Sequence, residues 1–186
     1  MRKVLPFLSL LIVFALVIPG MRAQASAQGQ AAQGQAQGQG RGQAQAAAPK
    51  PGVDAATAKK MVAAAEAAAL AANAAVAIAV VDGNGDLVYF ERMDGAAARA
   101  VTSSQGKARA ALLFGKPTKE VQDAMTAGKP ITATLTNPAA GAWELTIGQG
   151  GLPIIKDGKV VAAIGAGGSA PANDEKFAQA GLDAIK

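Results

Sequence analysis

The sequence contains no cysteine and no histidine in 186 residues. The absence of cysteine excludes disulfides as a source of stability. The absence of histidine removes the commonest general base and a common metal ligand, and it makes a Ser-His-Asp or Cys-His mechanism impossible within this chain. Aromatic residues make up only 4%, so the core has to be built from alanine, valine, isoleucine and leucine.

A strong charge of one sign is also missing from most of the chain. The net charge is +5, but three of the 18 basic residues (Arg2, Lys3 and Arg22) lie in the first 25 residues, which hold no acidic residue. The rest carries 15 basic and 13 acidic side chains. No cluster of Lys and Arg interleaved with aromatics is present, so we predict no nucleic-acid partner.

The first 25 residues have the organisation of a signal peptide. Arg2 and Lys3 precede an apolar run from Val4 to Ile18, and Ala23-Gln24-Ala25 has the small-x-small form of a cleavage site. We predict a signal peptide over 1–25, cut after Ala25, with Ala23 as second choice. The alternative is an uncleaved anchor, but about 15 apolar residues are short for a span of roughly 20. The mature protein then has no stable membrane span and is periplasmic or secreted.

Residues 26–50 are dominated by Gln, Ala and Gly and carry few charges. Such a segment buries too little apolar surface to offset the entropy lost on ordering. We predict a disordered tether here. The alternative is a segment that binds a partner or the cell wall.

Residues 51–186 are predicted to form one domain in the α/β (α+β) class. Two turn signals, Asp82–Asp86 and Asp157-Gly158, join apolar runs as hairpins, which indicates an antiparallel sheet of roughly five strands flanked by helices. Within the first strand Val76, Ile78 and Val80 share one face, while alanines occupy the other and let a helix approach. The expected helices are 54–72, 96–114, 117–128 and one capped by Asn173, and the expected strands are 74–81, 87–93, 143–147, 152–155 and 160–164.

Several phrases of this domain, in this order and spacing, resemble the GlcG/HbpS family, which includes haem-binding HbpS-like proteins and the C-terminal domain of PduO-type proteins. They are Ala79–Asp82, Arg92–Gly95, Lys107-Ala108, Pro117-Thr118, Gly150–Pro153, Asp157-Gly158, Gly165–Gly168 and Asp174.

The resemblance implies a homo-oligomer that binds haem or another small molecule. Some members are exported haem-binding proteins that sense or scavenge haem in oxidative stress. The alternative is a small-carboxylate-binding enzyme or accessory protein of glycolate-type metabolism. Whether the chain is an enzyme stays open, with binding favoured, because no catalytic group stands out.

Candidate ligand-binding residues are Arg92, Met93, Lys107, Gly150 and Gly151. The two cations would hold a carboxylate or a haem propionate. Their structural alternatives are an arginine paired with Asp94 or Glu91, and a lysine whose stem covers apolar surface.

Without histidine, the conventional haem-iron ligands left are Met93, Met61, Met125 and Tyr89, each of which has core packing as its alternative. If none serves, apolar contacts and propionates would hold a haem. Gly150 and Gly151 would border the pocket, together with the loop Gly165–Ser169. Asp174 and Glu175, in the next helix, argue against a phosphate on that loop. No spacing typical of a metal site is visible.

Overall fold

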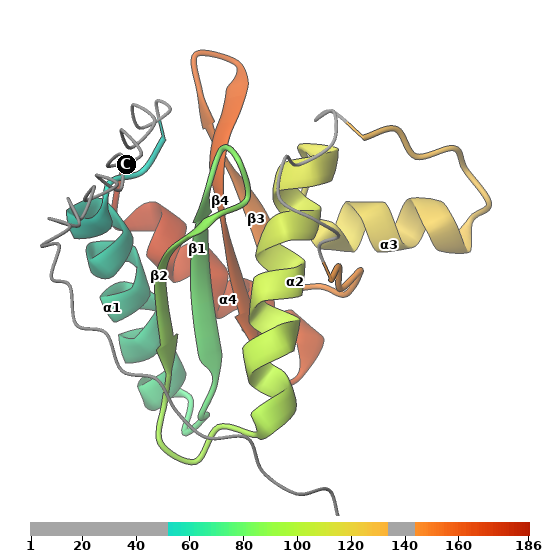
Figure 1. The fold of residues 1–186 in the computed structure, drawn as a ribbon. Helices are drawn as coiled ribbons and strands as arrows, with labels where there is room; N and C mark the ends of the chain where they lie inside the picture. The colour runs from blue at the N-terminus through green and yellow to red at the C-terminus, as the bar shows by residue number, and fades with distance from the viewer. Residues whose placement is uncertain (1–51, 134–143) are drawn as a thin grey trace, which may run out of the picture. The chain divides into compact units, whose positions relative to one another are not determined.

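Figure 1 shows a computed structural model of the chain, which describes residues 52–133 and 144–186. The predicted signal peptide (1–25) and tether (26–50) lie outside the described residues. Within the described ranges no helix has the length and apolar character needed to cross a bilayer. The described part contains four helices and four strands in the order α1-β1-β2-α2-α3-β3-β4-α4.

The strands form one antiparallel sheet in the order β2-β1-β4-β3. Its members are β1 (Ala77–Asp82), β2 (Leu87–Arg92), β3 (Gly151–Lys156) and β4 (Lys159–Gly167). Both predicted hairpins are present. Asp157 and Gly158 have φ angles of 50° and 72°, and two successive positive φ values are what a tight hairpin turn requires. The side chain of Asp82 accepts hydrogen bonds from the amides of Asn84 and Asp86 in the other turn.

The two faces of the sheet are covered by different helices, as Figure 1 shows. The predicted large face, with Val76, Ile78 and Val80, packs in one cluster with Met61 of α1 (Ala55–Ala71) and Phe177 of α4 (Pro171–Asp183). The small face packs on α2 (Ala98–Phe114), with Ala79 and Ala163 beside Ala108 and Leu112. The predicted fold class is therefore confirmed.

Two local predictions are wrong. Residues 144–147 lie in no strand, and Trp143 lies outside the described residues, so the described sheet has four strands rather than about five. This segment packs on α2 instead, since a Cβ on Gly106 would overlap Thr146. The last helix begins at Pro171 after the cap residue Ala170, not at a cap formed by Asn173, because proline is pre-organised for a first helical position.

The helix α1 begins as predicted. Asp54 is its N-cap, and its carboxylate accepts a hydrogen bond from the amide of Thr57 at 2.7 Å. This bond favours the charged form and lowers the pKa of Asp54.

Glycines in β4 bring α2 unusually close to the sheet. A Cβ on Gly165 would lie 2.6 Å from the amide nitrogen of Ala108 and would overlap the carbonyl of Ser104. A Cβ on Gly167 would lie 3.0 Å from the hydroxyl oxygen of Ser103. Gly165 is therefore required by the helix backbone that lies over it, and Gly167 makes a tight contact with Ser103 and Ser104.

We expect Gly165→Ala to lower the free energy of unfolding by about 1–3 kcal/mol, because the added methyl group overpacks the α2–β4 contact. Urea denaturation measures the change. Gly148→Ala is the matched control, since a Cβ there meets only ordinary van der Waals contacts, the nearest at 3.7 Å. Equal stability of the two variants would contradict the close packing described above.

Candidate functional site

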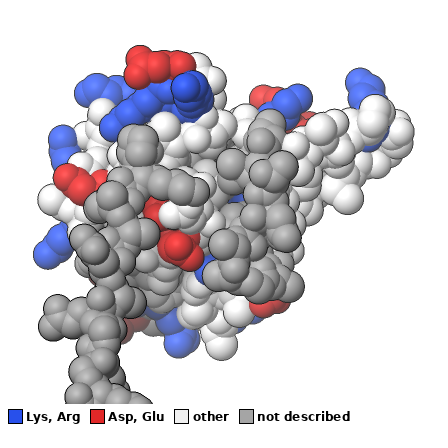
Figure 2. All heavy atoms as spheres, turned by 45° about the horizontal axis from the view of Figure 1, so that its top comes forward, with Lys and Arg blue, Asp and Glu red and all other residues white. Residues whose placement is uncertain are grey.

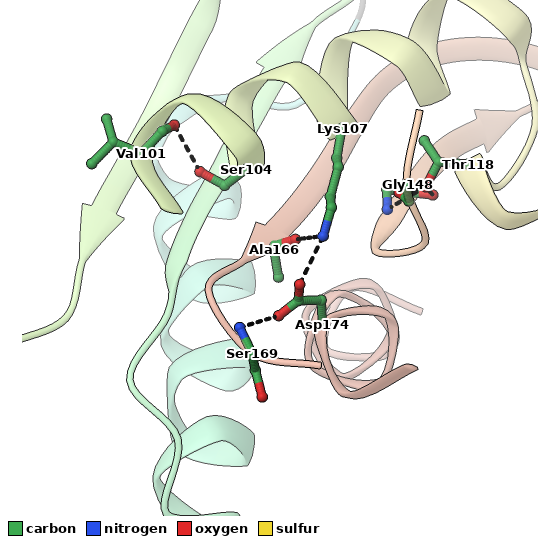
Figure 3. Close-up of polar contacts among 9 residues, drawn as sticks. Val101, Ser104, Lys107, Thr118, Gly148, Ala166, Ser169 and Asp174 are labelled. Carbon is green, nitrogen blue, oxygen red and sulfur yellow. Dashed lines mark hydrogen bonds and ion pairs between the residues drawn. The ribbon is translucent and has the colours of Figure 1, made fainter. Parts of the chain in front are cut away.

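The most buried charges of the described residues form one ion pair between the two helical layers. Lys107 of α2 is 5% exposed, and its Nζ donates to Oδ2 of Asp174 at 2.7 Å and to the carbonyl oxygen of Ala166 at 3.0 Å. Asp174 lies in the first turn of α4, and its Oδ1 accepts a bond from the amide of Ser169 at 3.0 Å. Figure 3 shows the lysine reaching past the end of β4 to the carboxylate.

The burial of Asp174 affects its ionisation. Removal from water raises the pKa of the Asp174 carboxyl above its ordinary value, and the hydrogen bonds from Lys107 and Ser169 only partly offset that rise. Perturbed titration beside a cleft is a feature of functional sites as well as of structural ion pairs.

Two glycines leave space for the ion pair, and one threonine holds the loop that contains them. Gly150 has a φ of 127°, and a Cβ there would lie 2.8 Å from Cβ of Asp174 and 3.0 Å from Nζ of Lys107. A Cβ on Gly151 would overlap the carbonyl of Lys107. Thr118, at the start of α3 (Thr118–Thr126), fixes this loop because its hydroxyl donates to the carbonyl of Gly148 and accepts from the amide of Gly151.

A cavity of about 290 Å³ opens over the ion pair, and we call it the α2–α4 cavity. Three of its residues, Arg99, Ser103 and Lys107, follow one another at four-residue spacing on α2 and therefore share one face of that helix. The turn before α4 and its first residues form the other wall. The lining residues are Arg99, Ala100, Ser103, Lys107, Gly168, Ser169, Pro171 and Asp174.

A second cavity of about 290 Å³ lies between the end of α2, α3 and the segment after α3, and we call it the α2–α3 cleft. Most of its lining is apolar, and Lys116 and Glu120 supply charge. The lining residues are Phe114, Lys116, Glu120, Val121, Ala124, Pro130, Ile131 and Thr132. The two cavities share no lining residue.

The structure gathers three of the five predicted ligand-binding residues. Lys107, Gly150 and Gly151 lie against one another, whereas Arg92 and Met93 line neither cavity. The guanidinium of Arg92 donates from Nε and Nη2 to the carbonyl oxygen of Ala96, at 3.1 and 2.6 Å, and pairs with neither predicted carboxylate. A single ligand held by all five residues stays a prediction.

The candidate iron ligands are mostly occupied elsewhere. Met93 is buried, and its Sδ accepts from the amide of Val76 at 3.5 Å. Met61 is fully buried, and the Tyr89 hydroxyl donates to Glu91. Met125 is 53% exposed. In residues 52–133 and 144–186 no group of three acidic, histidine or cysteine side chains is placed to hold a metal ion.

Sequence reasoning missed the partner of Lys107 and the two residues that accompany it. The dipole of the following helix is a sufficient local explanation for Asp174, and neither Arg99 nor Ser103 belongs to the motifs named above. The four-residue spacing of Arg99, Ser103 and Lys107 is the signal that could have found them.

On the face drawn in Figure 2, basic and acidic side chains are interspersed.

Comparison with known proteins points to one family. A family model described as "Haem degrading protein HbpS-like" matches residues 53–183. An "Uncharacterized 15.0 kDa protein in dhaT-dhaS intergenic region" from Citrobacter freundii is 36% identical over 105 residues, which are 56% of this chain and 71% of that protein. "Protein GlcG" of Escherichia coli strain K12 is 37% identical over 86 residues, 46% of this chain and 59% of GlcG.

Solved structures share the fold. The Klebsiella pneumoniae protein ORFY superposes with a TM-score of 0.62 at 32% identity, covering 72% of this chain and 90% of ORFY. A double mutant of Streptomyces reticuli HbpS gives 0.64 at 28% identity, covering 75% and 90%. A complex of PduOC with heme gives 0.63 at 21% identity, covering 73% and 96%, and at that identity it shows the fold alone.

Removal of one partner of the buried ion pair should destabilise the fold. We expect Lys107→Met to lower the free energy of unfolding by about 3–5 kcal/mol, because it leaves the Asp174 carboxylate buried without its partner. The double variant Lys107→Met/Asp174→Leu should regain part of this loss. Urea denaturation of the two single variants and the double variant measures the coupling.

Lys119→Met is the control for that experiment. Lys119 pairs with Asp123 at the surface, so its removal should cost less than about 1 kcal/mol. A double variant whose loss equals the sum of the single losses would show that Lys107 and Asp174 do not depend on each other.

Proposed function

The chain belongs to the HbpS-like family, and on this basis we propose that it is an exported protein that binds haem, with the α2–α3 cleft as the place where the porphyrin lies. The observation that carries the proposal is the match of residues 53–183 to a family model described as haem degrading. A protein of the same fold, PduOC, has been solved in complex with heme, which supports it.

The chemistry of the α2–α3 cleft fits part of a haem. Phe114, Val121 and Ile131 supply apolar surface for a porphyrin. The exposed Lys116 supplies a cation for a propionate. Pockets that enclose small molecules run from about 300 to 1,000 Å³, so a cavity of about 290 Å³ would leave part of the porphyrin outside. We infer that a second copy of the chain covers that part, as a homo-oligomer would allow.

In this proposal the haem iron has no conventional protein ligand. The chain has no histidine, Met61 and Met93 are buried in the core, and the exposed Met125 does not line the cleft. In this proposal haem is therefore held by apolar contacts and by its propionates. Haem supplies an iron centre when bound, while the residues of the cleft bind and orient the ring.

Hemin titration followed by the Soret band tests this proposal. We expect saturable binding by the wild-type protein. Ala124→Phe should weaken it at least tenfold by filling the cleft. Lys116→Gln should weaken it several-fold by removing the cation that faces a propionate.

Two variants act as matched controls for the hemin titration. Ala127→Phe adds the same ring at an exposed position at the end of α3, and Lys129→Gln removes an exposed charge outside the cleft. Both should bind hemin as the wild type does. Equal affinity in all five proteins, or a Soret band identical to that of free hemin, would refute the proposed site or haem binding respectively.

Export is tested by the N-terminus of the protein recovered from the periplasm or the medium. Because processing needs small side chains before the cut, we expect the mature chain to begin at Ser26. Ala25→Phe should then retain the leader, whereas Ala27→Phe, on the other side of the cut, should be processed normally. Mass spectrometry of the intact proteins decides. A protein that keeps Met1 and stays with the membrane fraction would contradict the proposal.

A further inference from the structure

The α2–α4 cavity contains a buried cation with more hydrogen-bond donors than the described residues provide acceptors. The Lys107 side chain is 6% exposed and lines the cavity. Its ammonium carries three N–H groups, and the described residues provide two acceptors, Asp174 and Ala166. A buried ammonium gains from a third acceptor, because an unmade hydrogen bond at a charged group is costly.

Two more donors stand on the same face of α2. Arg99 lies two turns before Lys107 and Ser103 lies one turn before it, and both line the cavity. Arg99 is exposed, and its guanidinium makes no ion pair among the residues that the structure describes. It is close enough to Asp174 for its charge to act on that carboxylate. A guanidinium presents a planar fork of donors that matches a carboxylate.

We propose that the α2–α4 cavity binds a small carboxylate, held by the guanidinium of Arg99, the hydroxyl of Ser103 and the third N–H of Lys107. This site is independent of the α2–α3 cleft because the two cavities share no residue. A cavity of about 290 Å³ suits a ligand of few atoms, which is the lower end of the range for small-molecule sites.

The charge balance selects a monoanion. Asp174 neutralises Lys107, so Arg99 leaves the lining with one net positive charge. The N-terminal end of α4, which contributes Pro171 to the wall, adds a partial positive charge. One carboxylate is matched by this charge, whereas the second negative charge of a phosphate dianion would have no cation of the lining to match it.

A carboxylate in the α2–α4 cavity would also explain why the ion pair is buried there. A buried ion pair is weak evidence for stability, because apolar residues of the same volume are often as good. Here Asp174 fixes the position of the Lys107 ammonium, and Gly150 leaves the space for both. Asp174 thus acts as a positioning residue for the cation that meets the ligand.

Acetate is the probe for the test. The purified, uniformly ¹⁵N-labelled protein is titrated with sodium acetate at constant ionic strength, with chloride as the exchanged anion. We expect saturable shifts of the Ser103 and Ser169 amides and of the Arg99 Nε–H signal. Arg99→Gln should weaken acetate at least tenfold, Ser103→Ala should weaken it several-fold, and inorganic phosphate should bind more weakly than acetate.

Arg109→Gln is the control, because it removes the same charge from the same helix at a residue outside the cavity, where Arg109 Nε donates to the carbonyl oxygen of Gly85. It should bind acetate as the wild type does. Shifts that do not saturate, or an affinity unchanged by Arg99→Gln, would overturn the site. Phosphate binding tighter than acetate would overturn the choice of a carboxylate. Hemin titration of Arg99→Gln should match the wild type, so a failure of the haem proposal and a failure of this one are separate results.

Discussion

The close approach of α2 to β4 sets where the buried side chains of α2 lie relative to the sheet. Gly165 and Gly167 lie directly under the backbone and side chains of Ser103, Ser104 and Ala108. With a larger residue in β4 the helix would stand further from the sheet, and the Lys107 stem would no longer reach the carbonyl of Ala166 and the carboxylate of Asp174. Glycines within a strand usually weaken it, but Gly165 and Gly167, near the end of β4, let α2 hold Lys107 close to the sheet.

The helix α2 is the common wall of both cavities. One face of α2 carries Arg99, Ser103 and Lys107, which line the α2–α4 cavity, and its last residue, Phe114, lines the α2–α3 cleft. The opposite face of the sheet, covered by α1 and α4, is a conventional apolar core. The two faces of the sheet therefore differ: large side chains fill one, and small side chains on the other let α2 bring polar groups close to the sheet.

Local signals in the sequence predicted much of this. The two hairpin turns, the division of Val76–Val81 into a large and a small face, and the family were all confirmed. The predicted strand at 143–147 was wrong for residues 144–147, because Thr146 packs against Gly106 of α2, a contact that periodicity does not report. Asp174 as the partner of Lys107 was missed because 67 residues separate them, and the dipole of the following helix gave a sufficient local reason for an acidic residue.

That separation has a consequence for the order in which the domain is completed. Lys107 is synthesised well before its counter-ion, and an unpaired ammonium cannot be buried against the sheet without a large desolvation cost. We therefore expect α2 to pack on the sheet only when α4 does, so that both helical layers form in one cooperative step. Such a dependence on distant contacts slows folding, and it disfavours a half-assembled intermediate in which only one face of the sheet is covered.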